Sequence, residues 1–354
     1  MSKYCCCNRK PDANIEIEKQ LERDRKTRKK EIEIILFGKT GSGKSTLFRQ
    51  LQIIYGDEYS DDEVGYFKRH VYKDIVQTIQ ALIYSMKVLN IQFQDDEKME
   101  MAKRVHSVDT FYMETISEEL ANAIKLLWND RGVQTCLESG EVSVSDSAIY
   151  FLNDMDRVFE PGYSPSKQDI VRVFIPTNGI QEYVFEQEGH LFRITEMGGF
   201  NLHTFRCRKL LFQFIQTIHV IFYVADISVF EKTVEGSDAE NEVGEAVDLF
   251  KLVVLHPWVS RTSVVLFLNK IDLFKEKLKK YNLHDHFPEY IGPDNDVEAG
   301  CHFMKNLFLA VQTEENRPIY PHFTCAIDTP GMKRVFDDII QYTIQSNIKK
   351  HKLL

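Results

Sequence analysis

Apolar positions along the chain change their spacing twice, and these changes mark three segments. Residues 32–37 form a short apolar run that predicts a buried strand, and residues 45–54 have the spacing of a helix. From Val64 to Met86, apolar residues recur every three or four positions, which predicts one long amphipathic helix. Because no strand-like run interrupts residues 60–168, we expect an all-helical insertion over that range.

Beyond the insertion, strand-like and helix-like patterns alternate, which is typical of a mostly parallel α/β sheet. Residues 183–185 and 191–195 flank a Gln187-Glu188-Gly189 turn and predict a hairpin. The later patterns are, in chain order, a strand at 220–225, a helix at 241–255, strands at 264–268 and 322–325, and a helix at 333–348. We therefore expect a split α/β domain over 31–59 and 169–354, a helical domain over 60–168, and a separate N-terminal segment over 1–30.

Charged residues are distributed unevenly along the 354-residue chain. The totals of 44 Lys+Arg and 53 Asp+Glu give a net charge of −9, yet residues 1–30 hold ten basic and five acidic side chains. The acidic remainder argues against sequence-independent nucleic-acid binding, whereas a short basic head suits an anionic membrane surface. Residues 12–30 are dense in charged residues and predict an exposed helix, with a solvated tail as the alternative.

No transmembrane, disulfide or zinc pattern is predicted. The apolar runs are far shorter than the roughly 18 residues that a membrane span needs, and the start of the chain lacks the apolar core of a signal peptide. Cys5, Cys6 and Cys7 form a run, and the other cysteines are widely separated without disulfide or zinc spacing. We therefore expect a cytoplasmic, thiol-reducing location.

A glycine-rich motif carries the strongest chemical information. The residues Gly38-Lys39-Thr40-Gly41-Ser42-Gly43-Lys44-Ser45 match G-x-x-x-x-G-K-S and lie between a predicted strand and a predicted helix. Glycines let successive backbone N–H groups turn toward one anion, and the helix N-terminus adds a positive dipole end. In such a loop Lys44 neutralises the β and γ phosphates and Ser45 coordinates Mg²⁺. The alternative is a glycine-rich turn with an exposed lysine.

A second motif, Asn269-Lys270-Ile271-Asp272, predicts which base is bound. It directly follows the strand-like run 264–268, where an open α/β sheet places its ligand-binding loops. An aspartate there can accept both guanine donors, the N1–H and the 2-amino group, and adenine offers no such pair. A polar turn that caps the next helix is the alternative.

Several further fragments resemble the heterotrimeric G-protein α subunits, and this resemblance covers essentially the whole chain. It includes the helical insertion, which small Ras-like GTPases lack. The matching fragments are Gly43-Lys44-Ser45-Thr46, Asp146-Ser147-Ala148, 152–157, 168–172, 267–270 and 322–326. The resemblance implies a Ras-like P-loop GTPase domain with a six-stranded mostly parallel sheet, an inserted all-α helical domain, and binding of GTP or GDP with Mg²⁺.

The resemblance also implies the members of the nucleotide site. Thr177 would join Ser45 as a switch I ligand of Mg²⁺, Glu196 would contact the metal through water, and Gly198-Gly199 would sense the γ-phosphate. The alternatives are that Thr177 is only a turn residue and that Gly198-Gly199 simply ends a strand. The implied nucleotide contacts are Gly38, Lys39, Thr40, Gly41, Ser42, Gly43, Lys44, Ser45, Thr46, Asp146, Ser147, Val171, Arg172, Thr177, Gly198, Gly199, Asn269, Lys270, Asp272, Cys325 and Ala326.

Two departures from the family pattern concern hydrolysis. Phe174 stands where the family has its arginine finger, and Phe200 stands where it has the glutamine that orients the attacking water. No catalytic residue of the family is therefore intact at these two positions, and we expect weak intrinsic GTP hydrolysis. The alternatives are compensation by Arg172 or Arg193, and a pseudo-GTPase scaffold that does not cycle. A P-loop kinase would leave the motif at 269–272 unexplained.

The resemblance further implies a G-protein-coupled receptor, a βγ dimer and a downstream effector as partners, at the inner membrane surface. Residues 201–211 lack the family's dense basic run, which leaves the βγ contact open. Ser2 excludes the usual N-myristoylation signal, so Cys5, Cys6 and Cys7 are the candidates for S-palmitoylation. Without acylation the chain would be cytoplasmic. The basic residues at 349–352 lie at the end of the chain that receptors recognise in members of this family.

Overall fold

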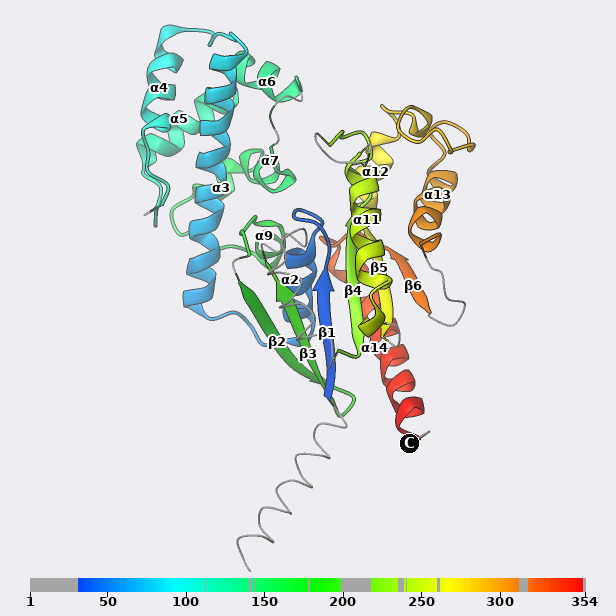
Figure 1. The fold of residues 1–354 in the computed structure, drawn as a ribbon. Helices are drawn as coiled ribbons and strands as arrows, with labels where there is room; N and C mark the ends of the chain where they lie inside the picture. Colours follow the sequence, from blue (N-terminus) through cyan, green and yellow to red (C-terminus); the bar gives the residue numbers. More distant parts are fainter. Residues whose placement is uncertain are drawn as a thin grey trace, which may run out of the picture. The chain divides into compact units, whose positions relative to one another are not determined.

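The computed structural model describes residues 31–111, 113–139, 142, 144–177, 179–198, 218–234, 239, 241–259, 262–311 and 318–352. By its contacts the chain divides into two compact units (Figure 1). The sheet unit comprises Met1–Lys44, Asn178–Cys325 and Pro330–Leu354, and the helical unit comprises Ser45–Thr177 and Ala326–Thr329. The domain limits expected from the sequence stay predictions beside this division.

The sheet unit contains six strands in the order β2-β3-β1-β4-β5-β6. They are β1 (Glu31–Phe37), β2 (Ile180–Gln187), β3 (His190–Met197), β4 (Val220–Asp226), β5 (Ser263–Asn269) and β6 (Ile319–Phe323). Among these described strands, the β2–β3 pair is antiparallel and the other pairs are parallel. The predicted six-stranded, mostly parallel sheet is confirmed. Since β1, β4 and β5 are parallel neighbours, the loops that follow them leave the same edge of the sheet.

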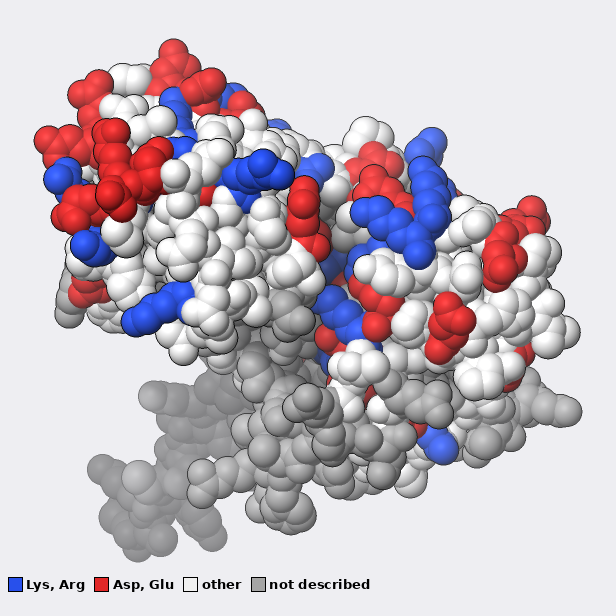
Figure 2. Space-filling view, turned by 90° about the horizontal axis from the view of Figure 1, so that it is seen from above, with Lys and Arg blue, Asp and Glu red and all other residues white. Residues whose placement is uncertain are grey.

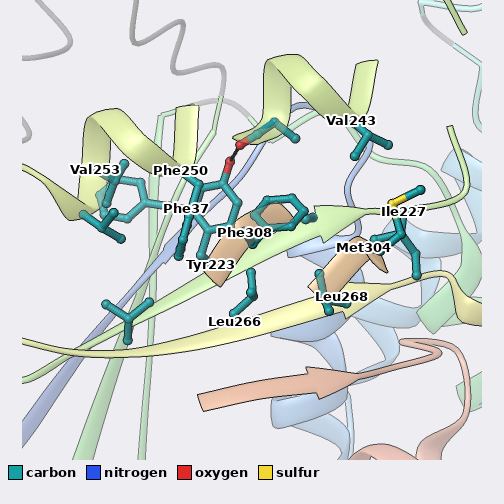
Figure 3. Close-up of a cluster of buried hydrophobic side chains, with 14 of the residues drawn as sticks. Phe37, Tyr223, Ile227, Val243, Phe250, Val253, Leu266, Leu268, Met304 and Phe308 are labelled. Carbon is teal, nitrogen blue, oxygen red and sulfur yellow. Dashed lines mark hydrogen bonds between the residues drawn. The ribbon is translucent and has the colours of Figure 1, made fainter. Parts of the chain in front are cut away.

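Helices pack on this sheet because its central strands are apolar on both faces. Every residue of β4 and β5 is buried, as is typical of parallel strands covered on both sides. The described helices of the unit are α11 (Glu242–Val254), α12 (Ile271–Lys277), α13 (Val297–Leu309) and α14 (Thr329–Lys352, whose first residue belongs to the helical unit), with short 3-10 turns at Pro257–Val259 and Leu283–Asp285. Figure 3 shows Tyr223 of β4 lying among Phe250 of α11 and Phe308 of α13.

The helical unit has its own apolar core. Its helices are α2 (Lys44–Tyr55, whose first residue belongs to the sheet unit), α3 (Asp61–Val88), α4 (Asp96–His106), α5 (Glu118–Trp128), α6 (Arg131–Glu138), α7 (Asp146–Leu152), α8 (Met155–Val158) and α9 (Lys167–Arg172). The predicted long helix is α3, which starts at a capping box formed by Ser60 and Glu63. Its apolar stripe, including Val71, Ile75 and Ile79, is fully buried. Within the described ranges, no helix is both long and apolar enough to traverse a bilayer.

A buried carboxylate, Asp169, organises the end of the helical unit. It accepts hydrogen bonds from both Nη atoms of Arg157 at 2.8 and 2.9 Å, and from the hydroxyls of Tyr150 and Tyr163 at 3.1 Å each. The Asp169 side chain is completely buried, so these donors replace the water that the charge has lost. Two of the fragments that carried the family resemblance, 152–157 and 168–172, thus meet at one ion pair.

Several elements extend beyond the ranges that the apolar pattern predicted. The hairpin strands reach 180–187 and 190–197, because edge strand β2 exposes most of its residues and can be polar there. Its turn places Glu188 at φ 51° and Gly189 at φ 71°, the left-handed pair of a tight hairpin turn. The last strand is Ile319–Phe323 and not 322–325. Its last hydrogen bond to β5 runs from Thr324 N–H to Leu268 O, and Thr324 O then accepts from Ile271 N at the start of α12.

Candidate functional site

The glycine-rich motif forms a loop at the carboxyl end of β1. Gly38 has a φ of 142°, and a Cβ at this position would lie 2.1 Å from the carbonyl oxygen of Val224, so only glycine fits. Gly41 and Gly43 also have positive φ values, of 80° and 101°. The Lys44 Nζ donates to the carbonyl oxygens of Gly38 and Lys39, at 2.9 and 2.7 Å. The motif is therefore a closed loop wrapped around an ammonium group, not a turn with an exposed lysine.

The ammonium of Lys44 is buried beside a carboxylate, and the two act on its pKa in opposite directions. Burial lowers the pKa of Lys44 to about 8, and the negative charge of Glu196 opposes this shift. Glu196 lies on β3 and is fully buried. A phosphate placed in the loop would favour the charged ammonium and raise its pKa again. Figure 2 shows acidic and basic side chains intermixed over the face seen from above, so no single sign of charge covers that face.

The second motif is connected to the loop by a buried amide. The Asn269 side chain is 1% exposed; its Nδ2 donates to Ser42 O at 2.9 Å, and its Oδ1 accepts from Thr324 Oγ1 at 3.2 Å. Because both amide atoms are used in this way, the motif is not simply a cap of α12. Asn269 instead joins the phosphate loop to the segment that follows β6.

The next residues of this motif are also held in place. Lys270 adopts a left-handed φ of 60°, and its Nζ pairs with Asp226 Oδ2 at 2.8 Å. Asp272 follows in the first turn of α12 and is half-buried. These contacts fix the backbone from which Asp272 projects.

In the helical unit, two hydroxyl groups meet. Ser45 Oγ of α2 lies 2.7 Å from Thr177 Oγ1, although the residues are 132 positions apart. Within the described residues, no group of three or more His, Cys, Asp or Glu side chains could hold a metal ion. A hydroxyl pair is a hard oxygen donor set that fits Mg²⁺, which is usually completed by water and phosphate oxygens.

The segment before Thr177 is fixed by Arg49, which the sequence analysis did not single out. Arg49 is 7% exposed, and its Nη1 donates to the carbonyl oxygens of Ile170 at 3.1 Å and Val173 at 2.5 Å. An arginine on the buried face of the predicted helix 45–54 is the pattern that could have indicated it. Phe174, which directly follows Val173 in the chain, is 48% exposed.

Like Arg49, Gln50 is a buried side chain of α2 that donates to a backbone carbonyl, in this case that of Ala326, a predicted guanine contact. Its amide is fully buried, and Nε2 donates to Ala326 O at 2.8 Å. Gln168 Nε2 donates to Ile327 O at 3.2 Å, so the turn at Ala326–Thr329 is held from α2 and α9. Cys325 belongs to the sheet unit and is half-buried.

Both arginines proposed as substitutes for the missing arginine finger have partners in the structure. Arg193 binds Glu31 at 2.8 Å and Glu182 at 3.3 Å. It pairs with Glu33 in the ladder, four residues before the end of β1, and hence about 13 Å along the strand from the loop. Arg172 stacks on the ring of Tyr150 with its guanidinium carbon 4.4 Å from the ring centroid.

The predicted contacts from the helical domain lie at the start of α7. Asp146 is exposed, and Ser147 donates from Oγ to Asp74 Oδ2 of α3 at 2.9 Å. Burial raises the pKa of the Asp74 carboxyl to about 6, while the Ser147 and Ser145 hydroxyls oppose the shift. Asp74 was not singled out from the sequence; it is a lone acid on a buried stripe.

Asp74 should make the helical unit less stable as the pH rises. Its folded-state pKa of about 6 exceeds the ordinary value of 3.8, so its contribution to folding is full below about pH 4 and is lost by about pH 6. Asp74→Asn should gain up to about 3 kcal/mol relative to the wild type at pH 7 and little at pH 4. Urea unfolding at both pH values measures this difference, and a gain that is equal at the two pH values would contradict it.

The remaining predicted residues lie partly outside the described ranges. Gly198 is described, and its N–H donates to Gly179 O at 2.8 Å. Gly199, Phe200, residues 201–211, Cys5, Cys6, Cys7 and the last two residues lie outside the described residues. Thr40, Gly41 and Thr46 lie in the loop and at the start of α2, and Val171 is buried in α9.

Comparison with known protein families agrees with this geometry. A family model described as the G-protein alpha subunit matches residues 11–344, which is nearly the whole chain and includes both units. The match spans the phosphate loop, the helical insertion and the Asn269 motif together. The chain therefore belongs to the G-protein alpha subunit family.

Proposed function

We propose that this alpha subunit is a GTP/GDP switch that binds guanine nucleotide with Mg²⁺ and hydrolyses GTP very slowly by itself. Its family membership makes it a guanine-nucleotide-binding alpha subunit of G-protein signalling. The observation that carries the proposal of slow hydrolysis is Phe174, an exposed apolar side chain at the arginine-finger position. Support comes also from Arg172 and Arg193, which are both engaged elsewhere.

Each part of the proposed site has a defined task. The N–H groups of the loop and the ammonium of Lys44 would bind the β and γ phosphates, while Asp272 would accept from the guanine edge. Ser45 and Thr177 supply the hydroxyl pair that would hold Mg²⁺, with Glu196 as a carboxylate that would act through water. When bound, the metal neutralises phosphate charge. Lys44 then keeps the nucleotide in place without needing the hydrolytic groups.

Slow hydrolysis follows from what is missing. An arginine finger contributes about 10³ to 10⁵ in kcat in this class of enzyme, which corresponds to roughly 4 to 7 kcal/mol in the barrier. A phenylalanine can neither stabilise the developing charge on the phosphate nor orient water. The protein would therefore remain loaded with GTP until a partner supplied these groups in trans.

The family membership implies βγ dimers and receptors as typical partners. We propose receptor-driven exchange and attachment to the inner face of the plasma membrane through thioesters at Cys5, Cys6 and Cys7, which lie in the basic head. Two or more acyl chains would anchor the protein stably. Without acylation the protein would remain cytoplasmic.

The nucleotide content and the single-turnover rate of the purified protein test the proposed switch. Bound GTP and a hydrolysis rate lower by at least about 10³ than that of an alpha subunit with both hydrolytic residues are the expected results. An ordinary hydrolysis rate would refute the proposed slow turnover. Absence of any nucleotide, even after incubation with GTP and Mg²⁺, would favour the second candidate, a scaffold that does not cycle.

A further inference from the structure

The side chain of Lys39, the second residue of the phosphate loop, is tied to α11. Its Nζ lies 3.3 Å from Glu242 Oε2 and also contacts Glu245 Oε2. The three side chains are only 22%, 34% and 27% exposed, so the pairs are partly shielded from water. Phosphate binding through N–H groups and Lys44 does not require this contact, which joins residues 203 and 206 positions apart.

The α11 end of the contact is rigid. Asn241 Oδ1 caps the helix by accepting from Gly244 N at 2.9 Å, and its Nδ2 donates to His286 O at 3.2 Å. One turn later, the hydroxyl of Tyr223 donates to Ala246 O at 2.5 Å, the dashed contact in Figure 3. The start of α11 is thus held to His286 and the following turn to β4, so the helix presents both carboxylates from a defined position.

The loop end of the contact shapes the anion cradle. The carbonyl oxygen of Lys39 accepts both Lys44 Nζ at 2.7 Å and Ser42 N at 3.3 Å. A displacement of Lys39 would therefore move the carbonyl that orients Lys44 and the turn that points Ser42 N. The loop is held from a second side by Asn269, which donates to Ser42 O.

We propose that Lys39 is a positioning residue: through Glu242 and Glu245 it holds the phosphate loop in its anion-binding shape and slows the release of guanine nucleotide. This inference rests on the proposed nucleotide binding. The ion pairs are partly exposed, so salt weakens them. The rate of nucleotide release should consequently rise with ionic strength in a way that depends on Lys39.

The test measures release of a fluorescent GDP analogue, with Mg²⁺, from the full-length chain. Lys39→Met and the double variant Glu242→Gln/Glu245→Gln should each release it about three- to tenfold faster than the wild type. Lys39→Arg, which keeps the charge, should stay close to the wild type. Lys277→Met is the matched control, because Lys277 pairs with Glu231 at a similar exposure on α12.

Two further readouts distinguish positioning from general destabilisation. Combining Lys39→Met with the two glutamine changes should add nothing, since both remove the same contact. Raising the salt from about 50 to about 500 mM should accelerate release more in the wild type than in Lys39→Met. If Lys39→Met does not fold, the near-isosteric glutamine variant carries the test.

The outcomes separate this inference from the proposed function. Equal release rates in all variants, with nucleotide still bound, would overturn the role of Lys39 and leave the switch intact. Fully additive effects would also overturn it. A wild-type protein that binds no guanine nucleotide would overturn both.

Discussion

Restoring both hydrolytic groups should convert this protein into a fast GTPase. Phe174→Arg combined with Phe200→Gln is expected to raise the single-turnover rate of GTP hydrolysis by about 10³-fold or more, or about 4 kcal/mol in the barrier. The change is structurally mild at position 174, because Phe174 is 48% exposed and fills no core space. Arg49 holds the carbonyl of the preceding residue, Val173, so the backbone that would carry the new arginine is already fixed.

The single variants and a size control sharpen this prediction. Phe174→Arg alone should give most of the gain, because the guanidinium acts on charge in the transition state, while Phe200→Gln alone should give less. Phe174→Leu changes size without adding a donor and should leave the rate at the wild-type value. A double variant that retains nucleotide but hydrolyses it no faster would show that these positions do not have the roles that the family resemblance implies.

Removing the ammonium of Lys44 should abolish tight nucleotide binding. Lys44→Met is expected to weaken the affinity for GTP by about 10²-fold or more, because it leaves phosphate charge in the loop without its buried partner. The loop already accommodates an extended side chain at position 44, which reaches Gly38 O and Lys39 O. Because methionine is similarly long and unbranched, the Lys44→Met protein should fold normally. Equilibrium titration with a fluorescent GTP analogue measures the loss, and Lys277→Met is again the control.

The pH dependence of binding provides an independent check on Lys44. Its pKa is about 8 in the protein without ligand, and a bound phosphate favours the charged form. The affinity should therefore be nearly constant below pH 8 and fall as the pH rises above it. Lys44→Met should not show this Lys44-dependent fall. Identical pH profiles for the wild type and the variant would contradict the assignment.

The sequence alone was sufficient for the elements whose pattern is local. The phosphate loop occupies eight consecutive residues, and the conformations of Gly38, Gly41 and Gly43 follow from the absence of a Cβ. The buried strands β4 and β5 were visible as continuous apolar runs. Edge strand β2 was underestimated, because its exposed face tolerates polar residues and dilutes the pattern.

The side chains that hold the site in place could not be predicted from the local sequence pattern. Arg49 and Gln50 lie in the predicted helix 45–54, yet nothing in that helix says that they bind the carbonyls of Val173 and Ala326. Asp74 is a lone acid within the apolar stripe of α3, and only the fold shows that its partner is Ser147. Polar side chains of this kind are compatible with either a solvent-exposed or a buried position, and only their neighbours distinguish the two.

Short-range regularities in the chain thus specify its elements and its phosphate loop, because each depends on neighbouring residues. The roles assigned to Phe174 and Phe200 came from the family resemblance and stay predictions. The links between those elements arise only on folding. Lys39 meets α11 across 203 positions, and Asn269 meets Ser42 across 227. Such pairs are brought together by burial of the apolar faces of β1, β4 and β5. The partial burial of Lys39 and the exposure of Phe174 are consequences of that packing, which no spacing along the chain encodes.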